Sequence, residues 1–169
     1  MEFRVWLESD LDQPWSVDEI KPPPIAYHTT PAFNIEAISS KGLEPRADNP
    51  QDEYDPRIYL ASTIMEAVSY AKQLRQALVK SKRVKSNWDE DYAIFQVNTS
   101  GLPNKFFEEK GLRRRGFYTK EPIPPQNIQF VTMVDHEILL AKNFKAFKDW
   151  YFWQTKPKPD FVQSFDPKG

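Results

Sequence analysis

Residues 58–70 read IYLASTIMEAVSY, and this stretch decides the fold class. Its first four residues are apolar and lie between turn-forming segments, which is typical of a short buried strand. Thr63 and Glu66 then form a capping box, and apolar residues continue at helical spacing as far as Leu78. A buried strand followed directly by an amphipathic helix predicts a domain that combines both kinds of element.

Upstream of this unit the chain alternates between regular segments and breaks. Residues 2–7 alternate apolar and polar side chains and predict a strand, whereas the prolines within 13–24 predict an irregular connector. A second short strand is expected over 25–28. A helix is expected next, beginning at residue 30 or at residue 34 and ending at Gly42.

Downstream of residue 80, strands dominate. Residues 92–98, 115–120 and 128–134 are rich in β-branched and aromatic side chains and predict three further strands. An aromatic helical segment is expected over 138–153, and the last residues are rich in proline. We therefore expect a single domain over residues 1–155 with a Pro-rich tail over residues 156–169.

The composition excludes several kinds of chemistry. The 169 residues include no cysteine and only two histidines, which rules out disulfides and thiolate nucleophiles and leaves little material for a metal site. A formal net charge of −1 provides no overall field that would attract nucleic acid or a membrane. Because no signal peptide or long apolar run is seen, we expect a cytoplasmic protein that is not bound to a membrane.

The sequence contains none of the common local motifs for nucleotide, metal or serine-nucleophile sites, but four short segments spread along the chain form a pattern. Residues 27–30 (YHTT) end one strand, residues 58–61 (IYLA) form another, Tyr70 lies in the following helix, and residues 118–121 (YTKE) precede Ile-Pro-Pro. In order and spacing these segments resemble the three signature motifs of the ADP-ribosyltransferase superfamily. The branch concerned is the histidine, tyrosine, glutamate branch, which includes the poly-ADP-ribose polymerase and diphtheria-toxin-like catalytic domains.

The resemblance covers roughly residues 28–131 and implies an α+β fold. That fold has a split, mostly antiparallel mixed sheet, flanking helices and a central cleft that holds NAD+. It implies that Tyr59 and Tyr70, eleven positions apart, sandwich the nicotinamide ring, which gains from stacking against two phenol rings. The resemblance assigns contacts with NAD+ to His28, Thr29, Thr30, Tyr59, Ala61 and Tyr70.

The resemblance also implies how catalysis would proceed. His28 orients the ribose, while backbone groups of Thr29 hold the carboxamide at a position where many members have glycine. Glu121, with His28 and Tyr59, forms the catalytic set, because its carboxylate would stabilise the positive charge that develops as nicotinamide leaves. The resemblance places four residues in the loop that meets the acceptor, namely Phe107, Arg113, Arg114 and Arg115. No metal is required.

Each of these residues also has a structural interpretation. The two tyrosines fit core positions, His28 fits a satisfied position at a strand end, and Glu121 fits an ordinary surface carboxylate. The arginines at 113–115 equally fit the solvent face of a strand. The residues alone leave both interpretations open.

The lead hypothesis is mono-ADP-ribosyl transfer from NAD+ to a macromolecular acceptor, a protein or a nucleic acid, by a monomeric enzyme. Such a small enzyme is compatible with a toxin or phage effector that acts inside a cell. One alternative keeps the fold but carries out NAD+ hydrolysis or RNA 2'-phosphate transfer, for which the arginines at 113–115 would be recruited. Another is an inactive binding module that uses the same pocket or the aromatic C-terminal segment.

Overall fold

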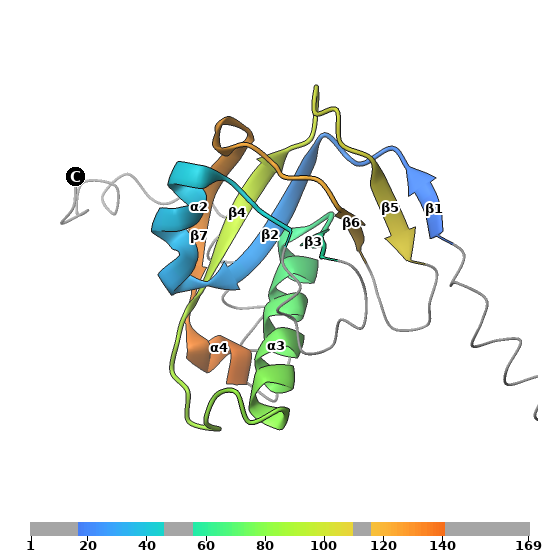
Figure 1. Cartoon of the computed structure of the whole chain (residues 1–169). Coiled ribbons are helices and arrows are strands. Elements are labelled where there is room, and N and C mark those ends of the chain that lie inside the picture. Colours follow the sequence, from blue (N-terminus) through green and yellow to red (C-terminus); the bar gives the residue numbers. More distant parts are fainter. Residues whose placement is uncertain (1–16, 46–55, 110–115, 141–169) are drawn as a thin grey trace, which may run out of the picture.

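The structure is a computed structural model that describes residues 17–45, 56–109 and 116–140. Its strands form two sheets, which Figure 1 shows side by side. The three-stranded sheet has the order β2-β4-β7 and the four-stranded sheet the order β1-β5-β6-β3. The strand bounds are β1 Val17–Ile20, β2 Ile25–Pro31, β3 Ile58–Leu60, β4 Tyr92–Asn98, β5 Phe106–Glu109, β6 Phe117–Thr119 and β7 Ile128–Val134.

Three helices accompany the sheets, which makes the described chain an α+β fold, as the sequence predicts. They are α2 (Ile35–Lys41), α3 (Ile64–Lys80) and α4 (His136–Leu140), and short 3₁₀ turns occupy Ala32–Asn34 and Pro125–Asn127. In Figure 1, α2 lies over the three-stranded sheet beside β7, whereas α3 runs away from the junction of the two sheets. The helix α3 packs against β2, β4 and α4.

The core consists of two clusters on opposite faces of the three-stranded sheet. Phe95 belongs to the cluster that contains Ile38 of α2, whereas its neighbour Ile94 belongs to the cluster that contains Val68 of α3. Because successive side chains of a strand point to opposite faces, α2 and α3 cover opposite faces of this sheet. The first cluster continues under the four-stranded sheet through Leu60 and its neighbours.

The start of α3 confirms the predicted cap at Thr63, whereas the return hydrogen bond of Glu66 goes to Ser62, one residue before the N-cap. Thr63 has an extended backbone and is the N-cap residue, and its Oγ1 accepts the N–H of Glu66 at 3.2 Å. The Glu66 carboxylate in turn accepts the N–H of Ser62 at 3.1 Å. Two N–H groups that no helical carbonyl can reach are satisfied in this way, so the helix begins where the sequence predicts.

Gly42 ends α2 as predicted and also fixes the chain that follows. Its φ of 85° lies in the left-handed region, and a Cβ there would lie 2.2 Å from the carbonyl oxygen of Ile123. Leu43 and Ile123 then exchange two backbone hydrogen bonds of 2.9 Å. The end of α2 is therefore joined to the segment that follows β6, and only glycine allows so close an approach.

Two sequence predictions need correction, and three more lie outside the described residues. The pairings between the described strands are all antiparallel, whereas a mixed sheet was expected. The stretch 13–24, expected to be irregular, contains the strand β1, which pairs with β5 at a distant point of the sequence. The predicted strand 2–7, the helical segment beyond residue 140 and the tail 156–169 fall outside the described ranges.

The remaining strands agree closely with expectation. The predicted strands 92–98 and 128–134 are confirmed, and the strand predicted over 115–120 is shorter, at Phe117–Thr119. The strand predicted over 25–28 extends to Pro31. Within the described ranges, no helix has both the length and the apolar character needed to cross a bilayer.

Candidate functional site

A split between the two sheets forms the candidate site. The sheets meet at one antiparallel bridge, in which Tyr27 and Ala61 exchange two backbone hydrogen bonds of 2.8 Å. In the described ranges this is the only β pairing between β2 and the chain at β3. If the two strands continued to pair, the next hydrogen-bonded pair beyond the bridge would be Thr29 with Tyr59. That pairing is absent from the described strands, so the sheets separate immediately beyond the bridge.

The backbone of Thr29 points into this split. In an antiparallel strand the N–H and C=O of one residue point to the same side, and successive residues alternate sides. Tyr27 directs both groups toward Ala61. Thr29 lies two positions further along β2 and therefore directs its N–H and C=O toward β3, away from its neighbour β4.

The imidazole of His28 bridges the mouth of the split. Its Nδ1 lies 3.0 Å from the carbonyl oxygen of Tyr59, a geometry in which Nδ1 carries the proton and donates it. The side chain links the two sheets where backbone pairing has stopped. His28 is half-buried and points to the face covered by α2, together with Thr30.

Tyr59 lies on the opposite face, which we call the α3 face. Tyr59 and Ala61 share a side of β3, and Ala61 is bridged to Tyr27, whose side chain packs in the cluster under α3. The Tyr59 ring centroid is 5.9 Å from that of Tyr118 on β6, with the planes tilted by 55°. The guanidinium of Arg57 lies 4.1 Å from the centre of the Tyr118 ring, a cation–π contact.

Tyr70 also lies against β6. A Cβ placed on Gly116 would lie 2.1 Å from the Tyr70 hydroxyl oxygen and 2.9 Å from the carbonyl oxygen of Leu60. The φ of Gly116 is 149°, so both its conformation and its surroundings require glycine. Tyr59 therefore lies beside Tyr118 of β6, and the Tyr70 hydroxyl lies beside Gly116, the residue before β6. That the two rings sandwich a nicotinamide remains a prediction of the resemblance.

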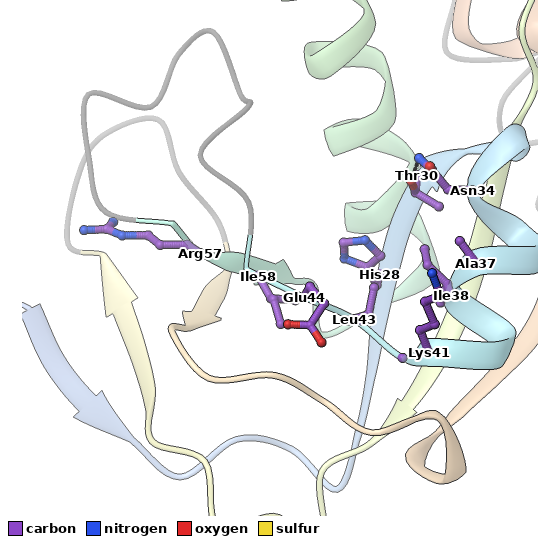
Figure 2. Close-up of a pocket in the computed structure, with 11 residues that line it drawn as sticks. His28, Thr30, Asn34, Ala37, Ile38, Lys41, Leu43, Glu44, Arg57 and Ile58 are labelled. Atoms are coloured by element: carbon purple, nitrogen blue, oxygen red, sulfur yellow. Dashed lines mark hydrogen bonds between the residues drawn. The ribbon is translucent and has the colours of Figure 1, made fainter.

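A hollow lined by both apolar and polar side chains lies on the other face, which we call the α2 face. Its volume is about 150 Å³. Figure 2 shows the side chains of β2, α2 and the segment after α2 arranged around it, while the Arg57 side chain points away. The amide of Asn34 donates to the Thr30 hydroxyl at 2.9 Å. The lining residues are His28, Thr30, Asn34, Ala37, Ile38, Lys41, Gly42, Leu43, Glu44, Arg57 and Ile58.

The remaining predicted residues lie elsewhere or serve structural roles. Ala61 is fully buried and closes the inner end of the split with both of its backbone groups. Phe107 lies on β5 with its ring 5.6 Å from that of Tyr118. Neither Tyr59 nor Tyr70 lines the hollow on the α2 face. The arginines at 113–115 fall outside the described residues.

Glu121 is exposed, and its carboxylate holds a neighbouring loop. Its Oε2 accepts the N–H of Lys105 at 2.8 Å, and its carbonyl oxygen accepts the Asn104 amide at 3.0 Å. These bonds join the turn between β4 and β5 to the segment after β6. Glu121 is not among the residues that line the hollow.

Several residues of the site were missed by sequence reasoning. Asn34, directly before α2, and Lys41, the last residue of α2, border the hollow. Arg57 contacts Tyr118, and Gly116 makes room for Tyr70. Gly116 lies inside the strand predicted over 115–120, and a glycine within a strand pattern is a recognisable signal for a special backbone conformation. The other three carry no local signal, because their roles depend on contacts between distant segments.

A second group of titratable side chains lies away from the split, at the start of α4. Donor atoms of Asp91, Asp135 and His136 lie within 4.8 Å of one another. The Asp91 carboxylate accepts the His136 N–H at 2.9 Å, and Asp135 accepts the Glu137 N–H at 2.9 Å. The hydrogen bond that the His136 imidazole donates to the Asp91 carboxylate raises the pKa of His136. Both carboxylates are engaged as helix caps, which accounts for the group without a metal.

Comparison with known proteins adds no family to this description. No family model matches the chain, and no curated protein matches it in sequence.

Proposed function

We propose that the chain is a mono-ADP-ribosyltransferase that binds NAD+ across the split between its two sheets. The observation that carries this proposal is the direction of the Thr29 N–H and C=O, which point into the split. A primary carboxamide offers an acceptor oxygen and N–H donors, so it complements this pair of backbone groups. The proposal also assigns the chain to the split-sheet fold of the superfamily whose motifs its sequence resembles.

The α3 face supports the proposal through its tyrosines. Nicotinamide in NAD+ is a flat cationic ring, which is attracted to the negative faces of phenol rings. Tyr59 and Tyr70 both border β6 and both are half-buried. Under the proposal, these rings hold the nicotinamide while Thr29 holds its carboxamide.

The α2 face supports binding of the rest of the dinucleotide. The hollow of about 150 Å³ admits a sugar or a phosphate group but not the whole molecule. His28, Thr30 and Asn34 supply hydrogen-bonding groups for sugar hydroxyls, and the ammonium of Lys41 complements a phosphate. NAD+ would thus pass from the α3 face through the split to the α2 face.

The proposed reaction breaks the bond between the ribose and the nicotinamide nitrogen. The bonding electrons leave with nicotinamide, the acceptor's nucleophilic atom forms a bond to the anomeric carbon, and that atom loses its proton. A carboxylate near the ribose would stabilise the transient positive charge. Glu121 remains the residue predicted for this role.

One observation favours a second function, NAD+ binding without transfer. The Glu121 carboxylate already accepts the backbone N–H of Lys105 at 2.8 Å, which is a sufficient structural reason for a carboxylate there. If that hydrogen bond is its whole role, the domain captures NAD+ but lacks the charge that transfer requires. The two functions predict different behaviour of one variant.

The test compares the wild-type chain with Glu121→Gln. Labelled NAD+ is incubated with each protein and total cell lysate, and free nicotinamide and label in protein, RNA and DNA are measured. The glutamine oxygen still accepts the Lys105 N–H, so the loop is preserved while the charge is removed. For the transferase we expect nicotinamide release to fall about 100-fold to 1,000-fold with unchanged affinity for NAD+.

Other outcomes separate the remaining functions. Wild-type binding of NAD+ without nicotinamide release would support the binding module. Unchanged activity of Glu121→Gln, with loss after Arg114→Gln, would support the arginine-dependent alternative. Failure of the wild-type chain to bind NAD+ would contradict the proposal as a whole.

A further inference from the structure

The side chain of Thr29 carries an unexplained polar atom. Its Oγ1 is buried and has no hydrogen-bond partner among the described residues. The buried threonines at other positions behave differently. Thr30 accepts the Asn34 amide, Thr99 donates to the carbonyl of Pro23, and Thr119 accepts the N–H of Glu121. Thr29 is therefore the exception that requires a reason.

The strand register shows where this hydroxyl lies. Tyr27 and Thr29 share one side of β2, and Tyr27 packs in the cluster beneath α3. Across the split, the position opposite Thr29 is Tyr59, which lies on the same α3 face. The Thr29 side chain therefore lies on the face that carries the tyrosines, directly beside its own backbone N–H and C=O.

An unpartnered buried hydroxyl lowers the stability of the free protein. Valine has nearly the same shape and would fill the position without burying a polar atom, so the fold has no need of the hydroxyl. The stability that the free protein lacks is regained when a ligand in the split forms the missing hydrogen bond with this hydroxyl. Polar groups that are satisfied only by a ligand commonly determine which ligand is accepted.

We propose that the Thr29 hydroxyl is a specificity-determining group that accepts a hydrogen bond from the primary carboxamide of the ligand. This inference rests on the proposed function and deepens it. The Thr29 N–H donates to the carboxamide oxygen, and the amide hydrogen on the same edge of the carboxamide is shared between the Thr29 C=O and Oγ1. All of the polar atoms of the carboxamide are then held by one residue, and a ring with a carboxylate or a secondary amide is disfavoured.

The test uses Thr29→Val, which removes only the hydroxyl, and Thr29→Ser, which keeps it. Calorimetry measures the Kd of each full-length protein for nicotinamide and for its N-methyl amide, and thermal melting measures stability. We expect Thr29→Val to bind nicotinamide about tenfold more weakly, while Thr29→Ser stays within about twofold of the wild type. Amide methylation is expected to weaken binding to both proteins, and to weaken it more for the wild type, which loses the hydrogen bond to the hydroxyl as well as the one to the carbonyl.

The melting temperature provides the second readout. Thr29→Val is expected to melt at or above the wild-type temperature, because it removes an unsatisfied polar atom. A clearly lower melting temperature would show that the hydroxyl has a partner within the protein, and would overturn the inference. Equal affinity of Thr29→Val and the wild type for nicotinamide would overturn it as well.

The outcomes also separate this inference from the proposed function. If NAD+ is cleaved but Thr29→Val binds nicotinamide normally, the transferase stands and the role of Thr29 fails. If nicotinamide binding depends on the hydroxyl but no ADP-ribose is transferred, the role of Thr29 stands and the transferase fails. If the wild type binds neither nicotinamide nor NAD+, both are wrong.

Discussion

The two faces of the split differ sharply, although the same two strands supply both. On the α3 face, Thr29 and Tyr59 lie opposite each other among half-buried aromatic rings. On the α2 face, His28, Thr30 and Lys41 border a hollow whose lining combines polar and apolar side chains. Alternation of side chains along β2 is enough to produce this difference, because neighbouring residues necessarily serve opposite faces.

This comparison shows how one break in a sheet creates a site with two chemical characters. A flat aromatic group suits the α3 face, whereas a hydroxyl-rich or anionic group suits the α2 face. Between them, the backbone of Thr29 is released from strand pairing and points into the gap. A ligand with an aromatic carboxamide at one end and a sugar phosphate at the other matches this order, as NAD+ does under our proposal.

Gly116→Ala is expected to have the largest effect on stability and binding, because it disturbs the packing of Tyr70 on the α3 face. The new Cβ would lie 2.1 Å from the Tyr70 hydroxyl, and φ at this position is 149°. We expect a loss of about 3 kcal/mol in the free energy of unfolding, from steric overlap and backbone strain together, and loss of measurable nicotinamide binding. Urea unfolding and calorimetry measure the two effects.

Gly101→Ala is the matched control for this variant. Gly101 also has a positive φ, 77°, but nothing lies within 4 Å of its added Cβ. It is expected to lose only about 1 kcal/mol and to bind normally. Equal effects of the two variants would show that Tyr70 does not depend on the space at Gly116.

The second prediction tests whether the two faces bind different parts of the ligand. Tyr70→Leu removes an aromatic ring from the α3 face and is expected to weaken nicotinamide binding about tenfold, while binding of ADP-ribose changes little. Tyr70→Phe keeps the ring and is expected to bind nearly as the wild type does. A parallel loss of nicotinamide and ADP-ribose affinity in Tyr70→Leu would contradict the division between faces.

Lys41→Gln changes the α2 face, and it is expected to weaken ADP-ribose binding slightly while leaving nicotinamide binding unchanged. An exposed ammonium contributes little, so we expect ADP-ribose to bind about threefold more weakly, and less so at high salt. Nicotinamide affinity should not change. Lys80→Gln, at the exposed end of α3, is the control for a general loss of charge. An identical effect of the two lysine variants would remove Lys41 from the site.

The smallest expected effect concerns pH and lies outside both faces. The hydrogen bond that the His136 imidazole donates to the Asp91 carboxylate raises the pKa of His136 above its ordinary value of 6.5. The resulting stabilisation is present below that ordinary value and is lost as the pH rises through the raised pKa. Urea midpoints measured across this range should fall slightly, whereas His136→Gln should remove this dependence. A midpoint that rises over the same range in the wild type would contradict the sign.

Local signals made part of this fold predictable from the sequence. The strand and helix of residues 58–80 follow from an apolar run, the cap at Thr63 and helical spacing, all of which act between near neighbours. The strands β1 and β5 were not recognised, because each is stabilised chiefly by pairing with the other. A strand of four residues between prolines gives no periodic signal of its own.

The site shows the same division. The tyrosine pair was expected from the resemblance, and its role stays a prediction; in the structure Tyr59 lies beside Tyr118 and the Tyr70 hydroxyl beside Gly116. The direction of the Thr29 backbone was not predictable by spacing, because it depends on which residue of β2 pairs with Ala61. A shift of one residue in that register would have pointed Thr29 toward β4 instead.

The most direct test of the central claim follows the Thr29 backbone during a titration. The full-length protein, labelled with ¹⁵N, is titrated with NAD+ while the amide signals are recorded by NMR. Our account predicts a saturable shift of the Thr29 amide signal, with the signal of Thr132 on the outer strand β7 unchanged. Saturable binding that leaves the Thr29 signal in place, or no binding at all, would contradict it.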